Sequence, residues 1–214
     1  MRQRSMLAFV SCLAICAAAC AKNPGDDKPH AKVGQAAPSS QTATAPAAEK
    51  IALTPENSSI GFVGSKVTGS HTGGFTAFSG TVALAPSGMA ASGVSLDIDL
   101  NSTWSDSEKL TGHLKSPDFF DTATHPKATF ASTKVEPAAA GGPNYTVTGN
   151  LDLHGVTKSI SFPATIEATP QEVIVNAEFA INRKDFNIVY PGKPDDLIRD
   201  EVVLKIAVKA PRKV

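Results

Sequence analysis

The sequence contains almost no cysteine that a folded domain could use. Three cysteines occur among its 214 residues, and Cys12 and Cys16 both lie within an apolar stretch at the N-terminus. Cys20 follows that stretch, so a processed chain would keep one thiol. A single thiol excludes an intramolecular disulfide and a metal site made of several thiolates. The stability of the domain must therefore come from a hydrophobic core.

The chain also lacks an excess of charge of either sign. It has 20 basic and 20 acidic residues, and without Arg2 and Arg4 the balance is 18 to 20. The sequence has no basic stripe typical of nucleic-acid binding and no polybasic segment that would attract anionic lipids. We therefore expect no nucleic-acid partner, and charge alone predicts no other partner.

Long hydrophobic runs are missing except at the N-terminus, where residues 6–19 are mostly apolar. This stretch is too short to span a bilayer as a mature helix. Arg2 and Arg4 precede it and small residues lead into Cys20, which is typical of a bacterial lipoprotein signal peptide over residues 1–19. Cys20 would then be the first mature residue and carry acyl chains that anchor it to a membrane. The alternative is ordinary cleavage near Ala19, which leaves a free thiol.

Residues 20–49 have no aromatic side chains and are rich in alanine, proline, serine and threonine. Such a segment cannot bury enough apolar surface to offset the entropy lost on ordering, so we expect a disordered tether. Ala21 stands where an aspartate would indicate retention at the inner membrane by the usual bacterial sorting rule. We therefore expect an outer-membrane lipoprotein on the periplasmic side. Its domain, residues 50–214, is long enough for one sizeable core.

This domain is expected to be all-β. Apolar side chains recur at every second position in eight segments, which predicts strands with one dry face and one wet face. The segments are residues 59–67, 72–85, 92–101, 127–136, 144–154, 156–168, 172–182 and 200–210. Most connections are short, so neighbouring strands should pair antiparallel. The expected fold is an eight-stranded antiparallel barrel, filled by its own side chains or holding one small ligand, and a two-sheet sandwich is the alternative.

One segment, residues 105–120, interrupts the alternation between the third and fourth predicted strands. Ser105 and Glu108 have the spacing of a capping box, which predicts the start of a short helix, and Ser116-Pro117 predicts its end. This helix is too short to be stable alone in water, so its apolar side chains must dock on the barrel. These side chains are Leu110, Leu114, Phe119 and Phe120. They either plug one end of the barrel or also border a ligand cavity, and the residues alone leave both open.

Residues that could carry out catalysis or hold a metal are sparse. The histidines are His30, His71, His113, His125 and His154. No two of them have the spacing of metal ligands, so no metal site is predicted. The sequence has neither the Gly-x-Ser-x-Gly motif of many hydrolases nor a Walker-type phosphate loop. Asp97 and Asp99 alternate with apolar residues, as on a solvated strand face. This favours a binding module without a cofactor over an enzyme.

Charged residues at positions 183–185 and 195–200 flank a loop around Pro191. Opposite charges on its two sides predict a latch that holds the geometry of this loop. Exposed pairs of this kind contribute only about 0–1 kcal/mol each.

Several motifs, taken together, resemble the YceI-like family. The resemblance is concentrated in residues 108–130 and continues downstream, covering about residues 51–210 in order. The matching motifs are His113-Leu114-Lys115-Ser116, Asp118-Phe119-Phe120-Asp121, His125-Pro126-Lys127-Ala128-Thr129-Phe130, the hairpin Gly149-Asn150-Leu151-Asp152-Leu153-His154-Gly155 and the strand end Ile181-Asn182-Arg183-Lys184-Asp185-Phe186. Asn187 departs from the family pattern, since a glycine is usual at that position.

The resemblance implies a lipocalin-like barrel that holds a long isoprenoid or a similar, quinone-like amphiphile in a hydrophobic cavity, in the bacterial cell envelope. Apolar packing would supply the affinity and a few polar groups would orient the head group. Carried onto this sequence, it implies cavity-wall residues Phe62, Phe78, Phe130, Phe162 and Phe179, cap residues Leu114, Phe119 and Phe120, and a mouth residue, Arg183.

Two functions therefore remain open. The first is a non-enzymatic carrier of an isoprenoid-type lipid, tethered through Cys20. The second is a barrel filled by side chains that acts as a structural or protein-interaction module of the envelope. A homodimer is compatible with either.

Overall fold

The computed structural model describes residues 22–38, 49–85, 88–138 and 143–212, with backbone alone for 85 and 88–92. The strands are β1 (Lys32–Gln35), β2 (Glu49–Leu53), β3 (Ser58–Lys66), β4 (Gly69–Phe75), β5 (Phe78–Ala85), β6 (Gly88–Asp99), β7 (Thr103–Ser105), β8 (Lys127–Pro137), β9 (Tyr145–Leu153), β10 (Val156–Ala168), β11 (Glu172–Asn182), β12 (Gly192–Lys193), β13 (Asp196–Leu197) and β14 (Glu201–Pro211). The helices are α1 (Glu108–Leu114) and two short 3₁₀ turns, η1 (Leu100–Ser102) and η2 (Arg183–Phe186). The predicted signal peptide, Cys20 and part of the predicted tether lie outside the described residues.

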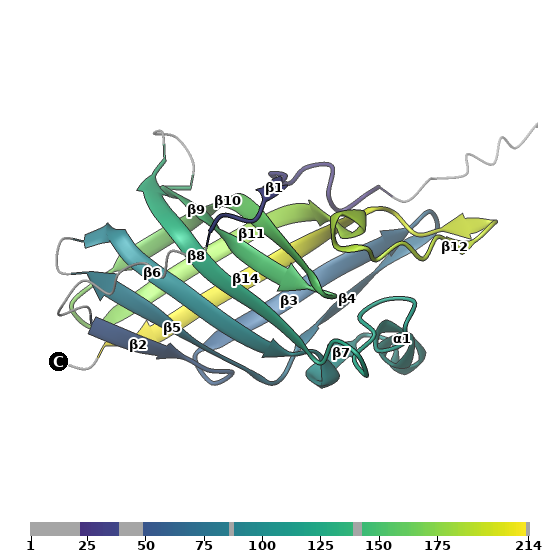
Figure 1. The fold of residues 1–214 in the computed structure, drawn as a ribbon, viewed down its shortest axis with the longest axis horizontal. Coiled ribbons are helices and arrows are strands. Elements are labelled where there is room, and N and C mark those ends of the chain that lie inside the picture. The colour runs from purple at the N-terminus through teal and green to yellow at the C-terminus, as the bar shows by residue number, and fades with distance from the viewer. Residues whose placement is uncertain (1–21, 39–48, 86–87, 139–142, 213–214) are drawn as a thin grey trace, which may run out of the picture.

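One antiparallel sheet forms the body of the molecule, with the strand order β2-β5-β6-β8-β9-β10-β11-β14-β3-β4-β7. The strands β2, β5 and β6 stand at one end of this order, and β3, β4 and β7 stand at the other. The chain connects the two ends twice, because β4 continues into β5 through Thr76 and Ala77, and β6 continues into β7 through η1. Backbone bonds bridge these junctions, from Thr76 N–H to Ser102 O and from Asp99 N–H to Ala77 O. The sheet therefore curls into an elongated barrel (Figure 1), as predicted, and the sandwich alternative is wrong.

The number of strands differs from the prediction in detail. The segment predicted as a single strand, residues 72–85, is divided at residues 76–77. Its first half, β4, pairs with β3 and β7, whereas its second half, β5, pairs with β2 and β6. A local pattern of alternation does not reveal such a break, because each half alternates on its own.

The helix α1 lies between β7 and β8, as predicted, but its cap is a different residue. Ser107 is the N-cap, and its Oγ accepts a hydrogen bond from the amide of Leu110 at 3.4 Å. Ser105 instead ends β7, where it is paired with Gly73 of β4. Its Oγ donates to the carbonyl of Ser107 at 2.7 Å. The prediction of a capping box was wrong because the backbone of Ser105 is already paired with β4 in the sheet.

Residues 22–38, which we call the N-terminal strap, were predicted to belong to a disordered tether but lie ordered on the barrel. β11 pairs with β10 only over residues 173–176 and then diverges from it. The strap fills the gap that this leaves: β1 pairs antiparallel with β10, Ala31 N–H donates to Ala180 O, and Ala180 N–H donates to Pro29 O. Amino-acid composition did not predict that the strap is ordered, because backbone groups make much of its contact with β10 and β11.

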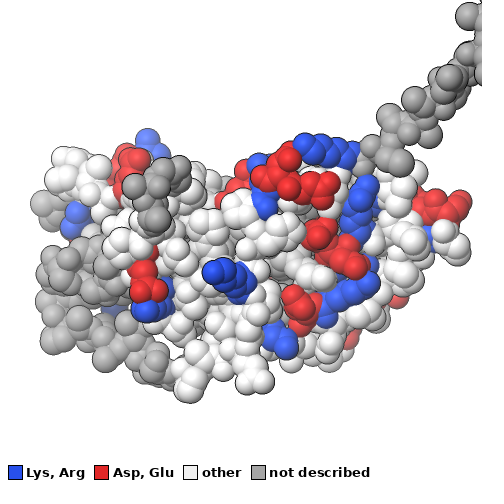
Figure 2. All heavy atoms as spheres, turned by 90° about the horizontal axis from the view of Figure 1, so that it is seen from above, with Lys and Arg blue, Asp and Glu red and all other residues white. Residues whose placement is uncertain are grey.

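Side chains also hold the N-terminal strap. Asn23 is buried, and its amide nitrogen donates to Glu201 Oε2 at 2.6 Å. Lys28 pairs with Glu178 at 2.9 Å, and Asn150 exchanges two hydrogen bonds with the backbone of Ala37. The face of the molecule seen in Figure 2 carries acidic and basic side chains close together rather than in separate patches. Among the described residues, no helix is long and apolar enough to cross a membrane.

Candidate functional site

The interior of the barrel contains a cavity of about 410 Å³. Apolar side chains from β2 to β6, β8 to β11 and β14 line it, together with residues of α1 and of the loop that follows. Several inward-facing side chains are only half-buried, such as Leu204 and Ile206 of β14, although they lie on the inner face of the barrel. The strands thus surround a space that their own side chains do not fill.

Every residue that the sequence nominated for ligand binding lies on the lining of this cavity. These residues are Phe62, Phe78, Leu114, Phe119, Phe120, Phe130, Phe162, Phe179 and Arg183. Their contact with a ligand remains a prediction. Strand parity placed the phenylalanines correctly because inward and outward positions alternate strictly along each paired strand.

Two groups of aromatic rings divide the lining. In the first, Phe162 stacks on Phe179 with ring centroids 4.1 Å apart and lies 5.8 Å from Phe130. In the second, Phe62 lies 5.8 Å from Phe75 and 6.3 Å from Phe120. These rings give the wall large, rigid apolar surfaces that a hydrocarbon chain could contact.

Phe75 is a lining residue that sequence reasoning missed. An unbroken strand over residues 72–85 would place Phe75 and Phe78 on opposite faces, since their positions differ by an odd number. The break at residues 76–77 brings both rings to the inside. The sequence Thr76-Ala77 between two phenylalanines carries no strong turn signal that would have revealed this change of parity.

The predicted cap covers one end of the cavity. Leu114 and Phe119 are buried in a cluster with Phe62 and Ile188, and Phe120 packs against that cluster. The ring of Phe119 also lies 4.9 Å from the ring of His113 and 5.5 Å from that of Tyr190. The segment that interrupts the alternation therefore borders a cavity, which answers the question that the sequence left open.

Arg183 lines the cavity, and its guanidinium is surrounded by backbone carbonyls of the loop before β14. It is 4% exposed, and its guanidinium donates to the carbonyls of Ile188 at 2.7 Å, Arg199 at 3.1 Å and Ile198 at 3.4 Å. It also lies 3.3 Å from Asp200. Burial lowers the pKa of Arg183, and Asp200 opposes that shift. These hydrogen bonds hold the loop before β14, which confirms the predicted latch. The contact of Arg183 with a head group remains a prediction.

Polar groups at the cap end of the cavity offer an alternative contact for a head group. Lys66 and His71 line the cavity, yet their side chains are 39% and 40% exposed, so the cavity approaches solvent beside them. Lys66 pairs with Asp196, and His71 lies 2.7 Å from Asp106. Hydrogen bonds from the Thr72 amide and from His71 lower the pKa of Asp106. The mouth is therefore ionic, whereas the interior is apolar.

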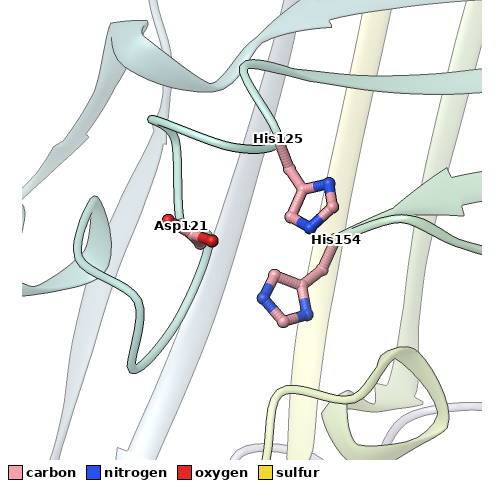
Figure 3. A group of neighbouring side chains, drawn as sticks. All are labelled: Asp121, His125 and His154. Carbon is pink, nitrogen blue, oxygen red and sulfur yellow. The ribbon is translucent and has the colours of Figure 1, made fainter.

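The fold also brings together residues that are far apart in the sequence. Ligand atoms of Asp121, His125 and His154 all lie within 4.8 Å of one another, although no metal site was predicted (Figure 3). None of these residues lines the cavity. Sequence spacing missed this group because His154 lies on the β9–β10 hairpin and the other two precede β8.

The curled antiparallel sheet, the one α-helix of the described residues and the internal cavity define a lipocalin-like barrel. The sequence model of the YceI-like domain matches residues 52–210, so the chain belongs to the YceI-like family. A UPF0312 protein of Pectobacterium atrosepticum is 35% identical over 146 residues, which cover 65% of this chain and 73% of that protein. Protein YceI of Escherichia coli is 34% identical over 122 residues, covering 54% and 62% respectively. The chain thus spans about two thirds of the length of these curated relatives.

Two solved structures have the same fold. BcnA of Burkholderia cenocepacia superposes with a TM-score of 0.64 at 28% identity, covering 72% of this chain and 96% of that one. A domain from Saccharophagus degradans, described as polyisoprenoid binding, superposes with a TM-score of 0.61 at 22% identity, covering 78% and 100%. At 22% identity, the comparison with the Saccharophagus domain shows a shared fold and nothing more.

Proposed function

We propose that this protein binds a long-chain isoprenoid or a similar, quinone-like amphiphilic lipid inside its barrel, without catalysing a reaction. The observation that supports this most directly is the apolar cavity of about 410 Å³ with ionic groups at one end. Sites for small-molecule ligands typically measure about 300–1,000 Å³ and combine apolar walls with a few polar groups. The polyisoprenoid binding named for the Saccharophagus domain points to the same class of ligand.

The shape of the site suggests how the ligand is held. The hydrocarbon chain lies against the rings of Phe162, Phe179 and Phe130, and its polar head lies at the cap end near Lys66 and His71. Each buried CH₂ group contributes about 0.8 kcal/mol, so two such groups change the dissociation constant roughly tenfold. Affinity should therefore rise with the number of isoprene units until the cavity is full.

Native mass spectrometry of the purified protein, before and after delipidation, tests this proposal. We expect bound lipid in the untreated sample and uptake of octaprenyl or quinone ligands by the emptied protein, with tighter binding of longer chains. A protein that is always purified empty and takes up neither ligand would rule out the carrier function and leave the structural module.

A pair of truncations separates the carrier from a filled barrel. Phe162 lines the cavity, whereas Phe186 is 0% exposed and does not line it. Replacing a fully packed phenylalanine by alanine costs about 3–5 kcal/mol, and we expect Phe186→Ala to lose that much in chemical denaturation. Phe162→Ala should lose less, because one side of its ring already faces a void, and should weaken lipid binding. Equal losses of stability with unchanged lipid binding would contradict the proposal.

We also propose that acylated Cys20 tethers the barrel to the outer membrane with its mouth close to the bilayer. Asn23 is held against Ser65 and Glu201 at the cap end of the barrel, and Ser65 lines the cavity. Cys20 precedes Asn23 by three residues, which span about 10 Å at most. Such a short connection supports direct exchange of lipid between the cavity and the membrane.

Fractionation of cells that express the full chain tests this anchor. The wild-type protein should be recovered with outer membranes and carry the mass of acyl chains on Cys20. Cys20→Ala should be soluble on the periplasmic side with unaltered lipid binding. Recovery of unmodified wild-type protein in the soluble fraction would exclude the anchor, but would leave the cavity's function untouched.

A further inference from the structure

Three side chains with metal-binding atoms converge outside the cavity. Asp121 and His125 belong to the loop between α1 and β8, and His154 belongs to the turn between β9 and β10. Their ligand atoms all lie within 4.8 Å of one another, and the three side chains turn toward the space between the two loops (Figure 3). All three are partly buried, so water screens them less than it screens surface residues.

The hydrogen bonding of His154 prepares it to act as a ligand. Its Nδ1 lies 3.2 Å from the backbone carbonyl of Phe186. A carbonyl can only accept, so Nδ1 is the donor, and in the neutral ring Nε2 is the nitrogen that offers a lone pair. Metal-binding histidines usually donate their other ring N–H to a carbonyl or a carboxylate in this way, which fixes the tautomer and the orientation of the ring.

Among the described residues, the other two groups have no competing hydrogen-bond or ion-pair partner. Within the described part of the chain, no hydrogen bond or ion pair engages the carboxylate of Asp121 or the ring nitrogens of His125, whose ring lies 5.0 Å from that of His154. Other histidines differ: His71 and His113 each lie within 2.8 Å of one carboxylate and belong to no such group of three. Among the described residues, a metal ion would therefore not have to displace a hydrogen-bond or ion-pair partner from either group.

The backbone holds these residues in place. The amide of His125 donates to the carbonyl of Asp121 at 2.7 Å, which closes a tight turn between the two ligands. Gly155 lies against the His125 ring so closely that a Cβ there would approach the ring carbon Cε1 to 2.6 Å. The His125 ring is therefore seated against the hairpin that carries His154.

We propose that Asp121, His125 and His154 form a binding site for a divalent transition-metal ion, with Zn²⁺ as the best match. Two imidazole nitrogens and one carboxylate oxygen suit Zn²⁺ and its neighbours, and three protein ligands leave a position open for water or another ligand. The bound ion joins the loop that carries Phe119 and Phe120 to the β9–β10 hairpin. The ion thereby fastens the cap from outside the barrel. Metal binding at this site does not depend on lipid binding, since none of the three metal ligands lines the cavity.

Titration of the metal-free protein with Zn²⁺, and with Co²⁺ as a spectroscopic probe, tests the site. We expect one ion per chain and visible Co²⁺ absorption bands that are typical of nitrogen and oxygen ligands. Asp121→Asn keeps the shape of the side chain and tolerates the positive φ of 45° at this position. It and His125→Gln should each weaken binding at least tenfold.

Two substitutions that remove the same kinds of side chain outside the group serve as controls. Asp118→Asn removes an exposed carboxylate from the same loop, and His30→Gln removes an exposed histidine. Both should bind Zn²⁺ as the wild type does. Weak or non-stoichiometric binding to the wild type, or equal affinity in the site variants and the controls, would overturn the proposal.

Hydrogen exchange supplies a second measurement that does not rely on affinity. Saturating Zn²⁺ should slow the exchange of backbone amides between residues 115 and 125 in the wild type and in Asp118→Asn. At a Zn²⁺ concentration just sufficient to fill the wild-type site, the same amides should be slowed less in Asp121→Asn and His125→Gln. Equal slowing in the site variants, or no slowing in the wild type, would show that the ion does not fasten the cap.

Discussion

At the scale of single residues, two phenylalanines of the cavity wall lie over glycines on a neighbouring strand. Phe62 is paired with Gly73, where a Cβ would approach the ring to 2.4 Å. A Cβ on Gly149 would approach the ring of Phe130 to 2.5 Å. The glycines let the rings lie flat on the sheet, which is a recognised way of stabilising glycine in strands. Gly73 thus makes room for a residue that lines the cavity.

We therefore expect Gly73→Ala to be destabilising. The new methyl group has to displace Phe62, and overpacking of this kind typically costs about 1–3 kcal/mol. Gly69→Ala is a matched control on β4, because no atom lies within 4 Å of its Cβ position. Chemical denaturation of both variants checks the expectation, and equal free energies of unfolding would refute it.

Arg183 is a second residue whose role depends on its partners. Arg183→Met would leave the carbonyls of Ile188, Ile198 and Arg199 without their donor, and unsatisfied buried groups cost about 1–3 kcal/mol each. We expect a loss of at least about 2 kcal/mol in denaturation experiments. Lys184→Met removes only a half-exposed pair with Asp200 and should change stability by less than about 1 kcal/mol. Comparable losses in the two variants would argue against the latch.

At the scale of elements, the N-terminal strap shows how a polar segment becomes ordered. It occupies the gap between β10 and β11, where unpaired backbone groups would otherwise face water or the core. Charged groups secure it, since Glu178 lies 2.9 Å from Lys28 and 3.2 Å from Lys205. Its hydrogen bond from Lys28 is the main cause that lowers the pKa of Glu178 below its ordinary value of 4.5.

This shift predicts how stability depends on pH. A carboxyl whose pKa is lower in the folded state stabilises the fold fully above pH 4.5, and this contribution is lost as the pH falls further, through the folded-state pKa. The free energy of unfolding, measured between pH 3 and 7, should therefore fall less steeply on acidification in Glu178→Gln than in the wild type. Glu167→Gln, which alters an exposed carboxylate on β10, should follow the wild-type curve. Identical curves for all three proteins would show that the ion pairs of Glu178 contribute nothing measurable to stability.

At the scale of the whole molecule, the barrel is closed by strands that change partners. β4 and β5 pair with different neighbours, and the break between them turns Phe75 and Phe78 to the same interior. The helix and loop then cover the end at which β3, β4 and β14 meet the ionic mouth. The cavity is a property of this curvature, because the same side chains on a flatter sheet would pack against a second layer.

Much of this architecture could be predicted from the sequence because strand alternation is a local property with a period of two. It predicted most of the long strands, the nominated inward phenylalanines and the segment that caps them, and the family motifs are concentrated in that same segment. Charge spacing likewise predicted the latch of the loop before β14. These features depend on residues that are neighbours along the chain.

The tertiary structure decided the features that depend on contacts between residues far apart in the sequence. Curvature and the divergence of β11 from β10 opened the gap for the N-terminal strap, which composition alone marked as disordered. The carbonyls of a loop that folds back over Arg183 made this residue part of the latch. The meeting of two loops placed His154 beside Asp121 and His125. No spacing in the sequence encodes such encounters, because they follow from how the whole sheet bends.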